Sequence, residues 1–197
     1  PPKASASFTS PMTATGLNIV GDLTTTEGYE FSGGTGNASG RPLIIGTDAA
    51  FKTCVTVAVS DASSSSDLHI GFRKIGVTLD AFEDYVEYAT IGIEGTANPN
   101  TIKLQTELDA NWDGTGDGVT TTDTTDTWAD AASKVICVLV SGAGVTTYTN
   151  AGIAPTSTAA FTFTDGSMVI PFIWSLAGAD IDGTDTVVLT HWTTTYQ

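Results

Sequence analysis

The sequence predicts an all-β protein folded as a two-sheet antiparallel jelly-roll sandwich. Three observations predict this fold. The 197 residues include 35 threonines, whose β-branched side chains favour strands. Apolar residues alternate with polar ones in several short segments, which is the period of a strand with one buried face. Turn residues separate these segments at short intervals and no helical pattern reaches ten residues, so a helical body is excluded.

Length and composition predict one domain with an N-terminal extension. A chain of 197 residues has the size of a single β-sandwich. Residues 1–18 contain three prolines and little periodicity, which predicts an extended arm. Residues 19–197 are expected to form a single sandwich domain. Because extended arms order on contact with a partner, we expect residues 1–18 to reach a neighbouring subunit.

The strands of the sandwich follow from the alternation. Residues 51–59 and their hairpin partner 68–72 have the clearest pattern. Residues 135–140 are apolar at every position, which predicts a central strand covered on both sides. Residues 79–88 and the threonine-rich stretch 111–126 are expected to be loops. The other expected strands are 42–45, 90–94, 102–106, 145–149, 161–163, 168–174 and 186–192.

The charge of the chain excludes two classes of partner. Acidic residues outnumber basic ones 22 to 7, which gives a formal net charge of −15 and a pI near 4.1. Phosphate backbones and anionic membrane surfaces would be repelled, so nucleic acid and membranes are not expected partners. The longest apolar run, residues 168–174, is interrupted by Pro171 and is too short to span a bilayer.

Two cysteines, Cys54 and Cys137, leave the redox state open. They lie in two separate strand patterns, and two cysteines without a C-x-x-C unit do not make a zinc site. Buried free thiols behave as small hydrophobic groups, and this is the interpretation that the pattern favours. A disulfide between them is the alternative.

The order of motifs in the last seventy residues resembles that of concanavalin A-like jelly rolls, the laminin G-like and glucanase-like sandwiches. Asp126-Thr127-Trp128 opens the block, a hairpin turns about Gly142 and Gly144, and Phe163-Thr164-Asp165-Gly166 precedes the last strands. The resemblance implies the sandwich fold. The lysine-poor, Thr/Gly/Ala-rich composition and the N-terminal arm are also similar to capsid decoration proteins of tailed phages.

Neither carboxylates nor histidines predict a catalytic site. Glycosidases of the resembled superfamily place acidic residues at alternate positions of one strand, whereas here Tyr85 stands between Glu83 and Glu87. These two glutamates are four residues apart, about 13 Å along a strand, and are expected to lie on a solvated face. His69 and His191 have no serine-nucleophile motif near them, so we expect no catalytic residues.

One segment matches part of a calcium-binding loop. Asp109, Asn111 and Asp113 alternate and are followed by Gly114, as in the first half of such a loop. Position twelve is Thr120 instead of a bidentate glutamate, so turn formation is the commoner explanation and calcium the alternative. The segment from Asp180 through Asp182 to Asp185 has the same two interpretations. No other cofactor is expected.

Three tryptophans could form a platform for stacking on sugars. Trp112, Trp128 and Trp192 would need to be exposed on one face, whereas tryptophans in sandwich strands are more often part of the core. Trp112 is the best candidate because it lies in an expected loop.

These observations favour a non-enzymatic structural protein over an enzyme. The main expectation is a capsid decoration protein on the virion surface, extracellular after release. It would bind the major capsid protein or another virion protein and form a homo-oligomer. The alternative is a carbohydrate-binding module of the concanavalin A-like type, assisted by calcium, with glycans as partners.

Overall fold

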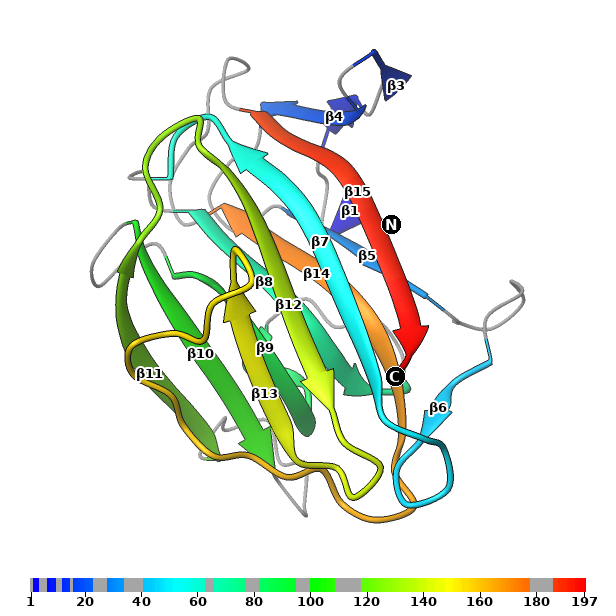
Figure 1. Ribbon diagram of the computed structural model, residues 1–197. Helices are drawn as coiled ribbons and strands as arrows, with labels where there is room; N and C mark the ends of the chain where they lie inside the picture. The colour runs from blue at the N-terminus through cyan, green and yellow to red at the C-terminus, as the bar shows by residue number, and fades with distance from the viewer. Residues whose placement is uncertain are drawn as a thin grey trace.

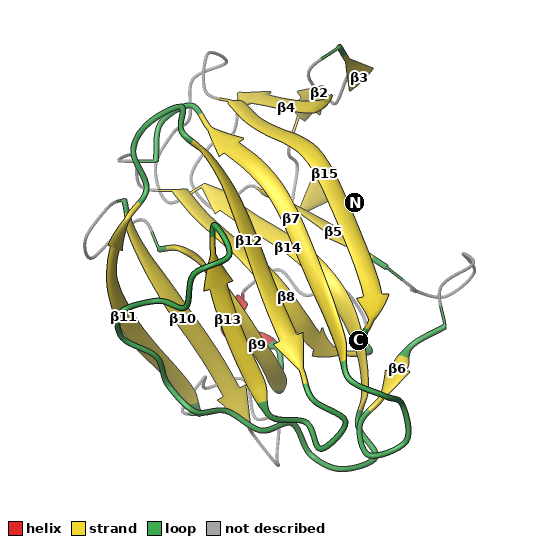
Figure 2. Ribbon diagram, in the orientation of Figure 1, coloured by secondary structure: helices red, strands yellow, loops and turns green. Residues whose placement is uncertain are grey.

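The computed structural model consists of two stacked antiparallel β-sheets, with the chain passing repeatedly from one layer to the other (Figure 1). The structure describes residues 2–3, 7–9, 12–14, 16–22, 28–33, 41–62, 66–76, 82–94, 100–108, 118–177 and 186–197. Within these ranges the helical residues are the single 3₁₀ turn η1, Phe82–Asp84, and most of the rest is strand (Figure 2).

Eight strands form the large sheet. Its order is β1-β5-β14-β8-β9-β10-β11, and β6 pairs with β14 at one end. Their bounds are β1 Pro2–Lys3, β5 Gly28–Ser32, β6 Leu43–Ile44, β8 Ser66–Lys74, β9 Glu87–Ile93, β10 Thr101–Leu108, β11 Val119–Thr127 and β14 Met168–Ala177.

Seven strands form the small sheet. Its order is β13-β12-β7-β15-β4-β2, and β3 pairs with β4. Their bounds are β2 Ser7–Thr9, β3 Met12–Thr13, β4 Gly16–Asp22, β7 Phe51–Val59, β12 Ser133–Val140, β13 Thr146–Asn150 and β15 Thr186–Tyr196.

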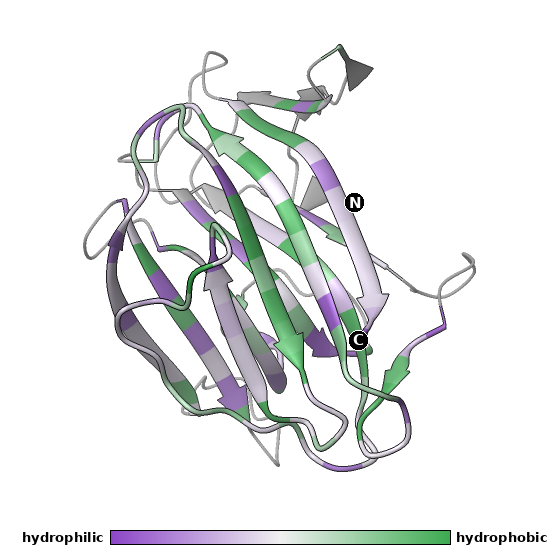
Figure 3. Ribbon diagram, viewed as in Figure 1, coloured by the Kyte–Doolittle hydropathy of each residue, from purple (hydrophilic) through white to green (hydrophobic). Residues whose placement is uncertain are grey.

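The core lies between the two sheets and is built by alternation. Along β7, every second residue from Phe51 to Val59 is buried, and the residues between them are half-buried on the outer face. Figure 3 shows the apolar character of β7 and β12 in the front layer. Trp128, fully buried, closes one end of the core and donates its indole N–H to the carbonyl of Ala132 at 2.8 Å.

Several strand predictions need correction. Residues 51–59 and 68–72 do not form a hairpin, because they belong to β7 in the small sheet and to β8 in the large sheet. Residues 135–140 are not covered on both sides: Val135 on the outer face of β12 is 41% exposed. Residues 119–127 form strand β11 and not a loop, because threonine suits an edge strand even without an apolar row. Residues 161–163 make only an isolated bridge between Thr162 and Val145. The strand from 186 continues to Tyr196.

The first eighteen residues contain short strands where they are described. Pro2–Lys3 pairs with β5, while Ser7–Thr9 and Met12–Thr13 pair with β4. Strand β4, Gly16–Asp22, spans residue 18 and pairs with the first part of β15. That residues 1–18 act as an arm reaching a second subunit stays a prediction.

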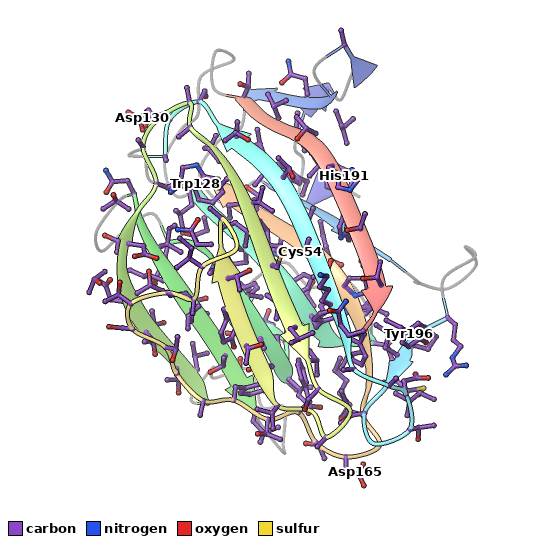
Figure 4. All side chains as sticks on the ribbon, viewed as in Figure 1. Cys54, Trp128, Asp130, Asp165, His191 and Tyr196 are labelled. Carbon is purple, nitrogen blue, oxygen red and sulfur yellow. A yellow bond between two sulfur atoms is a disulfide. The ribbon has the colours of Figure 1, made fainter. Side chains whose placement is uncertain are left out.

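Cys54 and Cys137 form a disulfide, so the interpretation as free thiols is wrong. The two cysteines face each other across β7 and β12, where the register pairs them directly. Both lie on the outer, half-buried side of the small sheet, and Figure 4 shows Cys54 on β7. The bridge therefore joins strands that backbone pairing already holds together.

No helix in the described part of the chain is long and apolar enough to cross a membrane.

Removing the disulfide is expected to destabilise the fold. The bridge closes a separation of 83 residues and restricts the unfolded chain, so a Cys54→Ala/Cys137→Ala variant should lose about 2–4 kcal/mol of unfolding free energy. Urea denaturation measures this loss. A reducing agent should produce the same loss in the wild type and leave the variant unchanged. A difference below about 1 kcal/mol would contradict the expected contribution.

Candidate functional site

A β-bulge in β15 turns aromatic side chains toward the space between the sheets. Leu189 pairs with Val57, but His191 pairs with Thr56, so Thr190 is an extra residue. Because strand side chains alternate, one extra residue exchanges the two faces of the strand that follows. Trp192 consequently stands opposite Val55, on the inner side of the small sheet.

The inner side of β15 forms one wall of a cleft at the open edge of the sandwich. Its volume is about 440 Å³, within the range of small-molecule sites. Residues from both sheets contribute, and Figure 4 shows Tyr196 at the end of β15 close to β6. The lining residues are Gly33, Arg41, Leu43, Pro171, Trp192, Thr194, Thr195 and Tyr196. Past Leu189, β7 is the only strand that pairs with β15 in the described residues.

Asp48 holds the polar side of this cleft in place. Its carboxylate accepts the backbone N–H of Ile44 at 2.7 Å, forms an ion pair with Arg41 and hydrogen-bonds the Tyr196 hydroxyl. The pKa of Asp48 is held below its usual value, first by the Ile44 N–H and then by Arg41 and Tyr196. The carboxylate therefore remains ionised near neutral pH and orients both Arg41 and Tyr196.

Thr53 anchors the aromatic side of the cleft from beneath. The indole N–H of Trp192 donates to Thr53 Oγ1 at 2.8 Å, and the Thr194 hydroxyl lies 3.2 Å from the same oxygen. Thr53 is fully buried on β7 and donates to the carbonyl of Thr193 at 3.3 Å. The Trp192 ring is thus fixed, half-buried against the core, while Tyr196 is 54% exposed.

A buried ion pair lies on the outer face of the large sheet. Arg73 on β8 pairs with Glu30 on β5 at 2.7 Å, and neither side chain is exposed. The Tyr85 hydroxyl donates to the other oxygen of Glu30, and the Arg73 guanidinium lies 4.7 Å from the centre of the Tyr85 ring. This ion pair is closed in by protein atoms and has internal partners.

Aromatic side chains from η1 close the same face beside it. Phe82 stacks on His69 at 4.1 Å and also contacts Tyr88 and Trp174. Burial lowers the pKa of His69 to about 3, so its imidazole is neutral at physiological pH. The Thr90 hydroxyl lies 3.5 Å from Nδ1 of the ring. These described side chains are buried, so the arrangement stabilises the sheet.

Several candidates from the sequence lie outside the described residues. The calcium candidates Asp109, Asn111 and Asp113, and with them Trp112, belong to the stretch 109–117. The second acidic segment, 180–185, also lies outside. Within the described residues, no group of three His, Cys, Asp or Glu side chains is placed to hold a metal ion.

The structure places the other candidates apart from each other. Glu87 is buried, not solvated: it accepts the Thr164 N–H and the Ser167 hydroxyl, both at 2.6 Å, and so fixes that turn. His191 is exposed on the outer face of β15, far along the sequence and in the other sheet from buried His69. Of the three tryptophans, Trp128 belongs to the core.

Trp192 lines the cleft, but sequence reasoning missed its companions. Tyr196 was missed because the strand pattern was ended at residue 192. Trp192, Thr194 and Tyr196 have the spacing of one strand face, which is the signal that could have grouped them. Arg41 and Asp48 come from a turn region far away in sequence, and nothing local indicates that they meet the C-terminal strand.

The fold is shared with proteins that act on or bind polysaccharides. An alginate lyase from Pseudomonas aeruginosa has a TM-score of 0.60 and 13% identity, covering 98% of this chain and 87% of its own. The carbohydrate recognition domain of Emp46p, in a potassium-bound form, has a TM-score of 0.63 and 6% identity with the same coverage. An alginate lyase from Corynebacterium sp. has a TM-score of 0.59 and 13% identity, covering 98% of this chain and 82% of its own.

These likenesses establish a concanavalin A-like jelly-roll sandwich. No protein-family profile matches the chain, and no curated protein resembles it in sequence. At such low identities the comparison shows the fold, which enzymes and non-catalytic recognition domains share.

The expectation of a capsid decoration protein is corrected by these comparisons. The similar structures reported above are polysaccharide lyases and a carbohydrate recognition domain, and they match over nearly the whole chain. The composition that indicated a virion protein, rich in threonine and acidic residues, is a property of exposed strands and loops and does not specify a partner.

Burial of His69 predicts a pH dependence of stability. The unfolded chain takes up a proton on this imidazole near pH 6.5, whereas the folded protein resists protonation until about pH 3. The unfolding free energy should therefore fall between these values as pH is lowered, by at most about 1.4 kcal/mol per pH unit from this residue. Denaturation of wild type and His69→Gln at several pH values measures the difference in slope. Equal pH dependence of the unfolding free energy in the two proteins would show that the folded state does not disfavour protonation of His69.

Proposed function

We propose that this protein binds saccharides in the cleft between β15 and β6. The observation that carries the proposal is the placement of an exposed tyrosine ring and a fixed tryptophan beside an arginine held by a carboxylate. Sugars present apolar C–H faces and hydroxyl edges. Aromatic rings pack against the C–H faces, and polar groups held in fixed orientations hydrogen-bond the hydroxyls.

Each part of the cleft supplies one element of sugar recognition. The Tyr196 ring offers a stacking surface whose orientation is set through its hydroxyl. Arg41 is 65% exposed, so its guanidinium retains donors for sugar hydroxyls after pairing with Asp48. The hydroxyl of Thr194, on the inner face of β15, adds a group that donates and accepts hydrogen bonds.

The comparison supports the same function class. Carbohydrate recognition domains and alginate lyases with this fold handle sugars, as their names state. We propose binding without hydrolysis, because glycoside hydrolysis needs two carboxyl groups about 5 to 10 Å apart and no carboxylate is among the described residues that line the cleft.

Loss of the tyrosine ring should weaken binding. Tyr196→Ala is expected to reduce the affinity for a bound oligosaccharide by about tenfold or more, equivalent to about 1.4 kcal/mol, because the stacking surface disappears. Tyr196→Phe keeps the ring and should lose less. A glycan array identifies the ligand, and isothermal titration calorimetry measures the affinities.

A matched control separates this effect from a general loss of exposed apolar area. Ile153, which is 72% exposed outside the cleft, serves this purpose as Ile153→Ala. The proposal fails if no glycan binds, or if Tyr196→Ala binds as tightly as the wild type.

We also propose that calcium binds at Asp109, Asn111 and Asp113. The support is the alternation of oxygen ligands before Gly114. Calcium should raise the melting temperature of the wild type after treatment with a chelator, because a ligand that binds only the folded state stabilises it. Asp109→Asn/Asp113→Asn should abolish the shift. Asp84→Asn/Asp165→Asn removes the same charge outside both acidic segments and should retain it. A wild type indifferent to calcium would contradict the proposal.

The disulfide supports a proposal on compartment. Disulfides persist in oxidising environments such as the periplasm and the cell exterior, where polysaccharides are also met. We therefore propose that the chain works outside the reducing cytosol.

A further inference from the structure

We infer that the cleft selects neutral saccharides and rejects acidic ones such as uronates. This inference rests on the proposed function and names its substrate class. It differs from what the fold alone would imply, because two of the similar proteins are lyases of alginate. The reason lies in how the cleft is charged.

The positive charge in the cleft is already neutralised. Among the described lining residues, Arg41 is the single formal charge. It is paired with Asp48, whose carboxylate is 10% exposed and is kept ionised by the Ile44 N–H. The pair therefore presents polar hydrogen-bonding groups with no net charge.

A sugar carboxylate would meet repulsion where a hydroxyl would not. To reach the Arg41 guanidinium at hydrogen-bond distance, it would have to come within about 5 Å of the Asp48 carboxylate. Charges this close are inside the Debye length and are screened little. The net charge of −15 adds repulsion at longer range. A hydroxyl group, by contrast, accepts from Arg41 and donates to the Tyr196 oxygen without either penalty.

Asp48 is thus a positioning residue with a second effect. It orients Arg41 and Tyr196, and it cancels the charge that would otherwise attract an acidic ligand. Asparagine at this position retains an oxygen for the Ile44 N–H while removing the negative charge. The two effects can therefore be separated.

The test uses pairs of oligosaccharides that differ only in their charge. Mannan and mannuronan hexasaccharides have the same β-1,4 backbone, as do glucan and glucuronan hexasaccharides, and each pair exchanges a CH₂OH group for a carboxylate. Calorimetry with the wild type should give at least tenfold tighter binding of the neutral member. Added salt should strengthen binding of the acidic member, because it screens the long-range repulsion from the net charge of −15, and leave the neutral one unchanged.

Two variants test whether Asp48 causes the preference for neutral saccharides. Asp48→Asn should reduce the preference for the neutral member at least fivefold. Asp126→Asn removes the same charge from β11, on the far edge of the large sheet, and should leave the preference unchanged. Circular dichroism verifies that both variants fold. If Asp48→Asn does not fold, the preference of the wild type for the neutral member of each pair still tests the inference.

The outcomes distinguish this inference from the proposed function. Equal or tighter binding of the acidic member by the wild type overturns the neutral preference and leaves saccharide binding standing. A folded Asp48→Asn variant with an unchanged preference overturns the role of Asp48. Absence of binding to both members of each pair, and to a glycan array, removes the proposed function and the inference together.

Discussion

The fold depends on burying two facing rows of apolar side chains between the sheets. On β7 the inward row runs from Phe51 to Val59, and it meets residues such as Ile70, Phe72 and Ile91 from the large sheet. Apolar burial of this kind is the dominant favourable term in folding. It is obtained only while each strand keeps its apolar residues on the face that points to the other sheet. The cleft, which takes residues from both sheets, is positioned by this stacking.

Strands with one alternating row of apolar residues directed into the core could be predicted from the sequence. Strands without such a row were harder to predict. Residues 51–59 alternate cleanly because one face is buried and the other half-buried. Strand β11 escaped prediction because its row is threonine, which forms an edge strand without an apolar signal. Residues 135–140 gave the opposite error: their apolar residues predicted a strand covered on both sides, yet Val135 points to the solvent side.

The cleft was less accessible to sequence reasoning than the fold. Trp192 could be singled out as an aromatic candidate, but its orientation depends on a bulge that no local motif announces. Arg41 and Asp48 meet Tyr196 only through the stacking of β6 against the end of β15, which is a tertiary effect. The disulfide was left open for a similar reason, because the pairing of β7 with β12 sets the distance between Cys54 and Cys137.

The chain contains two arginines, and each is held by a carboxylate. Arg73 is paired with Glu30 in the interior, where an unpaired charge would be costly. Arg41 is paired with Asp48 at the cleft, where solvent still reaches it. The same chemical pair is thus buried in the interior in one case and open to solvent at the edge of the cleft in the other, where the proposed function gives it a role in ligand contact.

The extra residue at Thr190 affects how the cleft is kept or lost among related chains during evolution. Because the bulge inverts the phase of β15, Trp192 and Tyr196 face the cleft only while the strand is bulged at this point. Among related chains, loss of the bulge with an unchanged number of residues would turn both rings to the solvent without altering a single aromatic position in the alignment. Deletion of Thr190 itself would instead leave a regular strand with both rings still directed inward.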